Sequence, residues 1–425
     1  MRKLIILVSI ILVGFTVVRV GYLLPAPTLI AMSGEGKIGS AAPKSLKMAG
    51  RVIGDFGAGT YEISGLKVKI EQFGEVTVSG RIETKGQLSR LSINMSDLSL
   101  TELKKSLGTL PLPEQGRLDG KVILTLGREK KEWKVQRLDY DILFGDLLFE
   151  KQKIPQFTGT AQGYYDLLAE TGRVNKAHFV TKTGGEIDLS GTVGKKGFDI
   201  SFTSEGLYLE DLLDSLPPAI KEKMGLKVEK VAGNATYDSE KGSFVSRASF
   251  SFYQAEGKGE VLGHRSEKGE QNISGRLSLE GLNLLPLSSL YGEGAQISGV
   301  ANLGLDFQTR MENLKFLQAI IETVPAKGIR QYLDFRAVKA LLALSTGSPP
   351  GYLVDKAYYG YRKLAARVTY QDRFLTIEGL AKKNRNKEYV LLGTPFGQTV
   401  NIAIDPRGNT VNLDDLKQRL GQAFK

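Results

Sequence analysis

Alternating apolar and polar residues run through much of this sequence, and they set what the chain can fold into. In GEIDLSGTVGKKGFDISFTSEG, which starts at Gly185, Ile187 and Leu189 alternate with polar residues. Phe198 and Ile200 resume the pattern after a turn of glycines and lysines. A repeat of two places successive side chains on opposite faces of a β-strand. The stretch therefore predicts a β-hairpin with one apolar and one polar face.

The same alternation returns along most of the sequence. It occurs in four further segments, at Val76, Val78 and Ile82; at Leu91, Ile93 and Met95; at Val122, Leu124 and Leu126; and at Leu303, Leu305 and Phe307. The 49 glycines are spread over 425 residues without a tripeptide period, which indicates many turns. We expect strands from about residue 51 to residue 309 and few helices there.

Three phrases share one pattern of leucines: MSDLSLTELKKSL from Met95, SEGLYLEDLLDSL from Ser204 and LEGLNLLPLSSL from Leu279. In each, the first leucine spacing is two and the later ones are three or four. A spacing of two belongs to a strand, whereas three and four belong to one side of a helix. Each phrase therefore predicts a strand that continues into a short helix.

The period of the apolar residues changes after residue 310. One side of a helix would hold Leu314, Leu317, Ile321 and Val324. A second helical run is expected over 329–344, after the break made by a proline and a glycine. Strands return in the C-terminal part, and leucines at 413–420 predict a closing helix.

The N-terminus, MRKLIILVSIILVGFTVVRVGYLL, carries an apolar run from Leu4 to Leu24 that only Arg19 interrupts. As a helix this run would reach roughly 31 Å, about one hydrocarbon thickness of a bilayer. Arg2 and Lys3 predict a cytoplasmic N-terminus, with the bulk of the chain on the other side of the membrane. A cleaved signal peptide is the alternative, but it needs a small-residue site directly after the run. We favour a retained single-pass anchor.

These patterns divide the chain into five expected segments. They are an anchor over 1–24, a linker rich in Pro, Ala, Gly and Ser over 25–50, a β body over 51–310, a helical segment over 311–348, and a β module with a terminal helix over 349–425. GEGKIG, from Gly34 to Gly39, matches G-x-G-x-x-G, but it lacks the preceding strand and following helix that a dinucleotide site needs. We interpret it as a flexible tether.

Residues with the chemistry of a catalytic or metal site are scarce. Cysteine is absent, and the two histidines, His178 and His264, stand in unlike contexts with no partner histidine nearby. A zinc or nucleophile site needs several convergent side chains. Carboxylate pairs such as Asp139 and Asp141 have no spacing that marks an acid and a base. We therefore expect a protein that is not an enzyme and that holds no metal or cofactor.

The net charge of +11 is concentrated near the C-terminus. From Arg310 to Glu388 there are 15 Lys and Arg residues against 7 Asp and Glu. Such a field favours anionic partners, either lipid headgroups or nucleic acid, although a solvated basic surface is an equal alternative. A cluster of aromatic and basic residues lies within this region and could form a headgroup interface or simply a packed β edge. Its members are Tyr358, Tyr359, Tyr361, Arg362 and Lys363. Because the bulk is expected outside the cytoplasmic membrane, we do not expect nucleic acid.

Taken together, an N-terminal anchor, a glycine-punctuated β body and a C-terminal module resemble the AsmA-like family of bacterial envelope proteins. The phrases that carry the likeness are GYLVDKAYYGYRKLAARVTYQDRFLTIEGLAKK and GTPFGQTVNIAIDP. The resemblance implies an elongated, bent antiparallel sheet with short capping helices. This sheet would form a groove with an apolar interior, through which phospholipid moves between the inner and outer membranes.

Nine residues would line that groove: Val76, Val78, Leu91, Ile93, Ile187, Leu189, Phe198, Ile200 and Phe202. The same alternation also builds the closed core of an ordinary β-sandwich. The alternative function is therefore a non-catalytic envelope scaffold that assists outer-membrane protein assembly or type II secretion. Part of the glycine-rich first half also resembles an inner-membrane subunit of the type II secretion machinery.

Overall fold

A computed structural model describes most of the chain. The described residues are 28–36, 44–55, 59–70, 74–83, 88–102, 115–129, 132–149, 154–208, 227–265, 270–289, 295–310, 313–346, 358–372, 374–384, 387–395, 400–406 and 408–412. They fall into two compact units, the first ending at Lys195 and the second beginning at Lys196. Both units are mainly β, with open antiparallel sheets and few short helices.

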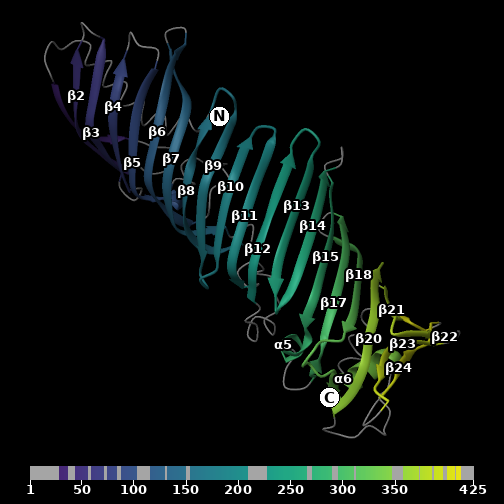
Figure 1. The fold of residues 1–425 in the computed structure, drawn as a ribbon. Helices are drawn as coiled ribbons and strands as arrows, with labels where there is room; N and C mark the ends of the chain where they lie inside the picture. Colours follow the sequence, from purple (N-terminus) through teal and green to yellow (C-terminus); the bar gives the residue numbers. More distant parts are fainter. Residues whose placement is uncertain are drawn as a thin grey trace. The chain divides into compact units, whose positions relative to one another are not determined.

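The first unit is an antiparallel meander of ten strands (Figure 1). The strands are β1 (Thr28–Gly36), β2 (Lys44–Asp55), β3 (Thr60–Ile70), β4 (Gly74–Glu83), β5 (Leu88–Ser99), β6 (Gln115–Glu129), β7 (Glu132–Phe149), β8 (Ile154–Asp166), β9 (Thr171–Thr181) and β10 (Glu186–Gly194). Each strand pairs with the next one along the chain. Antiparallel neighbours need only short connections, so the alternating segments pair in sequence order.

The second unit starts as another meander. Its long strands are β11 (Gly197–Tyr208), β12 (Lys227–Asp238), β13 (Ser243–Phe252), β14 (Ala255–Arg265), β15 (Gln271–Asn283), β17 (Val300–Arg310), β18 (Asn313–Val324), β20 (Tyr358–Gln371) and β21 (Phe374–Gly379), and they pair in this order. The shorter elements are α5 (Leu284–Ser289), β16 (Ile297–Ser298), β19 (Tyr332–Asp334), α6 (Phe335–Thr346), β22 (Lys382–Asn384), β23 (Lys387–Gly393), β24 (Ile402–Ile404) and β25 (Thr410–Asn412).

The C-terminal end of the second unit has a closed hydrophobic core. Strand β20 pairs with β18 and β21 along one half and with β19 and β23 near its start, and α6 contacts β19, β20 and β24. Leu333, Val338 and Leu391 are completely buried there. The Asp334 carboxylate begins α6, because it accepts a hydrogen bond of 2.7 Å from the Ala337 amide, as an N-cap residue does.

The helix predicted from Leu314 to Val324 is wrong, because this segment forms strand β18. Leu317 and Ile321 are four residues apart, and a spacing of four places two side chains on one face of a helix or of a strand. The ladders with β17 on one side and β20 on the other decide between the two. The second predicted helix is confirmed in part as α6, after the short strand β19.

The linker predicted over 25–50 is also wrong where the structure describes it. Residues 28–36 form β1 and residues 44–50 belong to β2, and the glycines at 34 and 36 pair in register with Leu46 and Lys44. Local composition is a weak guide to strands, because pairing with a neighbouring strand can override it. The predicted anchor at 1–24 and the closing helix at 413–420 lie outside the described residues. Among described residues, no helix is long and apolar enough to cross a membrane.

The predicted change from strand to short helix is confirmed for the third leucine phrase, in which α5 follows β15 directly. In the first phrase, a helical turn begins at Leu100 after β5. The second phrase leaves the described residues after Tyr208. The sheet also runs past the boundary expected at 310, because β18 continues the ladder from β17 to β20.

Candidate functional site

One face of the first sheet collects the predicted lining residues of that unit. Residues directly opposite each other in an antiparallel pair share a face. Val78 lies opposite Ile93, and Ile93 lies opposite Val122. The same row continues through β7, β8 and β9 to Gly191 on β10, two residues from Leu189. The six predicted lining residues of this unit therefore share one face, which we call the apolar face. They are Val76, Val78, Leu91, Ile93, Ile187 and Leu189.

The second sheet has an apolar face of the same kind. Phe198, Ile200 and Phe202 alternate along β11 with exposed polar residues. Most of their row mates across the meander are apolar or glycine; Ser246 in the row of Ile200 and Thr309 in the row of Phe198 are polar. The row of Phe202, for example, runs through Gly233, Ala248, Gly259, Leu277, Leu305, Ala319, Val368 and Ile377.

The nine predicted residues differ in burial. Leu91, Ile93 and Val78 are 1%, 6% and 7% exposed and belong to a hydrophobic cluster on strands β3 to β6. Val76 packs against that cluster and is half-buried. The other five, Ile187, Leu189, Phe198, Ile200 and Phe202, are also half-buried. In the first unit the apolar face is thus buried around β3 to β6 and partly accessible on β10, and in the second unit the corresponding face is partly accessible on β11.

The described strands of the first unit, and those from β11 to β18, form one layer within their own unit. In a β-sandwich, a second sheet packs about 10 Å away with its own apolar side chains. Here each long strand is paired with the next long strand along the chain, and the hydrophobic clusters draw their strand residues from neighbouring strands. Within each unit, this arrangement leaves the half-buried apolar side chains of β10 and β11 without a second sheet of the described strands over them.

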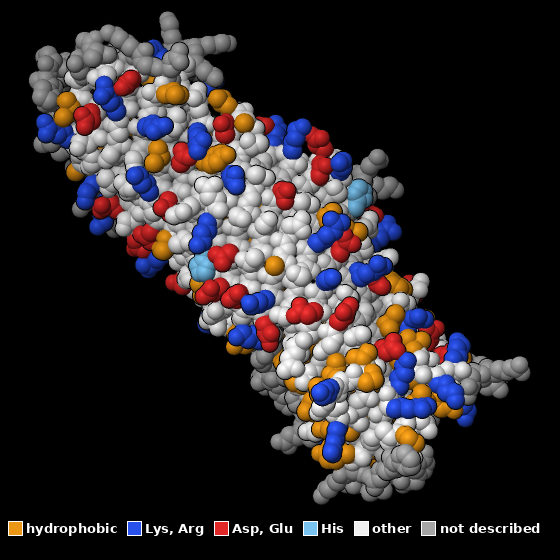
Figure 2. Space-filling view, viewed as in Figure 1, with side chains coloured by type: hydrophobic (Ala, Val, Ile, Leu, Met, Phe, Trp, Pro, Cys, Tyr) orange, Lys and Arg blue, Asp and Glu red, His pale blue; other side chains and the backbone are white. Residues whose placement is uncertain are grey.

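The opposite face of the second sheet is polar and carries cross-strand ion pairs. Arg276 Nε lies 2.7 Å from Asp306 Oδ1, and Arg367 Nη1 lies 2.7 Å from Glu378 Oε2. The hydrogen bond that Arg276 donates to the Asp306 carboxylate is the main reason why the pKa of Arg276 is raised. Figure 2 shows side chains of both charges interspersed over the sheet, with no large area of one sign across its middle. Such pairs solubilise this face and mark its strands as exposed to water.

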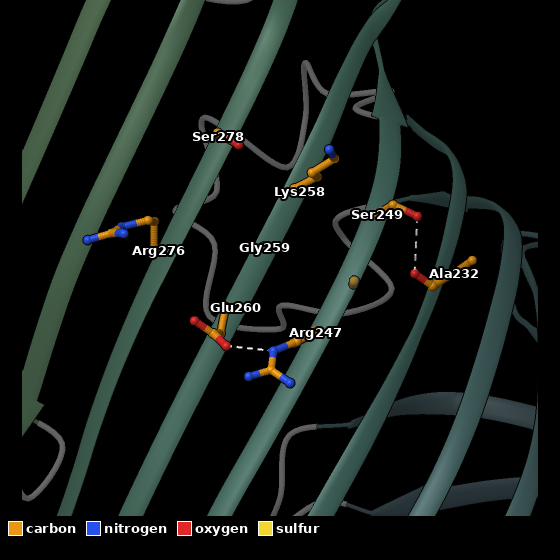
Figure 3. Close-up of a pocket in the computed structure, with 9 residues that line it drawn as sticks. Ala232, Arg247, Ser249, Lys258, Gly259, Glu260, Arg276 and Ser278 are labelled. Carbon is orange, nitrogen blue, oxygen red and sulfur yellow. Dashed lines mark hydrogen bonds and ion pairs between the residues drawn. The ribbon is translucent and has the colours of Figure 1, made fainter.

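A shallow hollow of about 450 Å³ lies on the polar face over β12 to β15. Figure 3 shows Arg247 and Glu260 turned toward each other, and their Nε and Oε1 atoms are 2.6 Å apart. Ser249 donates to the Ala232 carbonyl at 3.4 Å. Because both arginines that line it, Arg247 and Arg276, are already paired with carboxylates, we do not assign a binding role to this hollow.

The two histidines lie on strands β9 and β14, each on the polar face of its own unit. His178 Nδ1 lies 3.0 Å from Asp188 Oδ1 on the polar face, and Thr160 is the residue opposite His178 on β8. Both members of the pair are partly exposed, at 34% and 47%, which is typical of a cross-strand polar pair. His264 is exposed on β14. Among the described residues, no group of three or more His, Asp or Glu side chains could hold a metal ion.

The tyrosine cluster near the C-terminus divides between core and surface. Tyr359 and Tyr361 are 5% and 2% exposed, and the Tyr361 hydroxyl donates a 2.9 Å hydrogen bond to the Ser298 carbonyl. Burial raises the pKa of the Tyr361 phenol. Tyr358 is exposed, and Lys363 pairs with Glu322 at 2.6 Å. Two of the three tyrosines therefore belong to a packed β element.

Sequence reasoning missed a set of glycines inside the strands. Several occupy apolar-face positions, where the residue opposite is large, as Gly233 is opposite Phe202. The spread of glycines along the sequence indicates mainly turns. The signal was nevertheless present, because a glycine in phase with the apolar residues of an alternating strand marks a close approach by a neighbour.

Comparison of the chain with protein-family models, with curated proteins and with solved structures finds no match.

Proposed function

We propose that this protein binds phospholipid through the apolar faces of its sheets, which act as a groove for acyl chains. The observation that carries the proposal is the half-buried state of Ile187, Leu189, Phe198, Ile200 and Phe202 on single-layer sheets. In an ordinary globular domain, such residues would be covered by a second layer. A surface of this kind calls for an apolar occupant.

The energetics of lipid transfer support such an occupant. Each methylene of an acyl chain gains about 0.8 kcal/mol when it leaves water, so a chain of about 15 methylenes cannot cross water unaided at a useful rate. A sheet with one apolar and one charged face supplies a path on which the chain stays out of water while the protein stays soluble. The groove needs no catalytic residue for this task.

We further propose that residues 4–24 anchor the chain in the inner membrane and that its bulk lies in the periplasm. The length and flanking charges of the apolar run support this placement. The resemblance to the AsmA-like family supports transfer of phospholipid between the inner and outer membranes. Deletion of residues 1–24 should then move the protein from the membrane fraction to the soluble fraction.

Site-specific photo-crosslinking tests lipid binding. We would place a benzophenone amino acid at Leu189 or Ile200 on the apolar faces, in the full chain in its native membrane. Matched controls would carry it one residue further, at Ser190 or Ser201, which are exposed polar residues of the same strands. After irradiation, mass spectrometry should find phospholipid adducts at Leu189 and Ile200 and far fewer at the two serines.

Equal labelling of both faces would mean that lipid contact is unspecific. If none of the four positions captures lipid while Leu189 or Ile200 captures protein, the apolar face is an interface. The alternative function, a non-catalytic scaffold for outer-membrane protein assembly or type II secretion, would then replace lipid transfer.

A further inference from the structure

Aromatic rings cover glycines along the apolar face of the second sheet. Gly233 lies opposite Phe202, and a Cβ atom on Gly233 would come within 2.7 Å of Phe202 Cζ. The same relation holds for Gly257, where a Cβ atom would collide with the Phe250 ring. Real Cβ contacts do not become this short. These rings therefore lie across the neighbouring strand, in the space that a side chain there would take.

The pattern recurs in both units. Gly275 is opposite Phe307 in the second unit, and Gly159 is opposite Phe179 in the first. In both cases the ring occupies the place of the missing Cβ atom. All four phenylalanines are only half-buried, so each ring rests against a glycine and keeps part of its surface accessible.

The apolar face is flat at the glycines that are covered by rings. A phenylalanine that stood upright would interdigitate with a second layer, as side chains do in a closed core. A phenylalanine that lies over a glycine instead shields the peptide groups of that strand and adds a flat apolar area. Cross-strand rings of this kind also stabilise glycine-containing strands. The apolar face is therefore level where these four rings lie.

From this geometry we infer that the ligands are amphiphiles with linear acyl chains, which lie extended on the ring-covered glycines and contact them from one side. This inference rests on the proposed lipid-binding function and specifies how the chain is held. A pocket accepts chains up to a fixed length and rejects longer ones. An open, level surface gains affinity with each added methylene.

The expected gain per methylene can be worked out. Full burial of one methylene is worth about fourfold in affinity, and contact from one side captures about half of that free energy, or about twofold. The probe is a phosphatidylethanolamine with a diazirine near the end of one acyl chain, bound to the full chain held in amphipol after free detergent micelles have been removed. Saturated fatty acids of 10 to 18 carbons then compete for labelling, at concentrations below their micelle formation.

The concentration of fatty acid that halves labelling should fall about twofold per methylene over the whole series. A plateau or a loss of competition beyond some length would overturn the inference while leaving lipid binding intact. Absence of any labelling of the wild-type chain would instead count against the proposed function itself.

A pair of variants tests the role of the rings. Phe307→Ala removes a ring from the apolar face, whereas Phe316→Ala removes a half-buried ring from the polar face of the adjacent strand β18. Phe307→Ala should raise severalfold the concentration of fatty acid that halves labelling. Phe316→Ala should leave this concentration unchanged. Equal effects of the two variants would contradict the assignment. The chain-length series on the wild type stands even if Phe307→Ala fails to fold.

Discussion

Two alanine substitutions of strand glycines should change stability in opposite directions. A Cβ atom on Gly233 would lie 2.7 Å from Phe202 Cζ and 2.9 Å from Ala248 Cα, and closer still to the Arg247 carbonyl oxygen. The phenylalanine ring can rotate away, but the Ala248 and Arg247 backbone must shift. Gly304, on the polar face of β17, has no atom within 4 Å of its Cβ position.

The size of the difference follows from these contacts. Replacing glycine by alanine reduces the entropy of the unfolded chain, which stabilises the protein by about 0.4–1 kcal/mol where the alanine fits. This gain is common to both variants and cancels when they are compared. The remaining term is the cost of overpacking at Gly233, about 1–3 kcal/mol. Gly304→Ala should therefore be slightly more stable than the wild type, and Gly233→Ala should be less stable.

Urea unfolding followed by far-UV circular dichroism measures both variants in the same detergent. We expect the transition midpoint of Gly233→Ala to fall below that of the wild type and the midpoint of Gly304→Ala to rise above it. A Gly233→Ala protein as stable as Gly304→Ala would show that the ring and the neighbouring backbone do not occupy the space above Gly233. The account of the apolar face would then lose its geometric basis.

Three further predictions concern the closed C-terminal core and can be read by the same unfolding assay. Leu391→Ala removes a completely buried side chain and should cost about 2–5 kcal/mol, so a wild-type midpoint would contradict the packing described for this core. Tyr361→Phe should cost about 1 kcal/mol at neutral pH through loss of its hydrogen bond to Ser298. Because burial raises the pKa of Tyr361, the neutral phenol stabilises the fold fully below about pH 10, and the wild type should lose stability as the pH rises further. The Tyr361→Phe variant should lack the part of this loss of stability that ionisation of Tyr361 causes. Asp334→Ala should cost about 0.5–2 kcal/mol because it removes the cap of α6, and Asp334→Asn should recover most of it; equal losses in the two variants would argue against capping.

The alternation of residues predicts strands well because it is a local property. The residues of 187–202 that were predicted to share an apolar face do so along β10 and β11, and the predicted turn falls between these two strands. The common face of Val78, Ile93 and Leu189 can also be predicted from the alternation. A period of two decides which residues of one strand share a face, and pairing in sequence order brings the apolar faces of neighbouring strands to the same side. The mainly β class was therefore accessible from the sequence.

Burial and glycine packing were not accessible in the same way. Leu91 and Leu189 have the same local pattern, yet Leu91 is 1% exposed and Leu189 is half-buried. The difference depends on which neighbours surround each strand, and these are set by the ladder. Gly275 and Phe307 meet only because β15 and β17 pair across α5 and β16. Strand β18 was mistaken for a helix for a related reason, since its ladders with β17 and with the more distant β20 cannot be read from its own residues.

The most direct test of the central claim is the lipid content of the protein after extraction from its membrane. Native mass spectrometry of the full chain in mild detergent should detect bound phospholipid in stoichiometric amount. Leu189→Asp combined with Ile200→Asp should remove it, whereas Ser190→Asp combined with Ser201→Asp should not. A wild-type chain that carries no lipid, or lipid retained equally by both double variants, would contradict the claim that the apolar faces hold acyl chains.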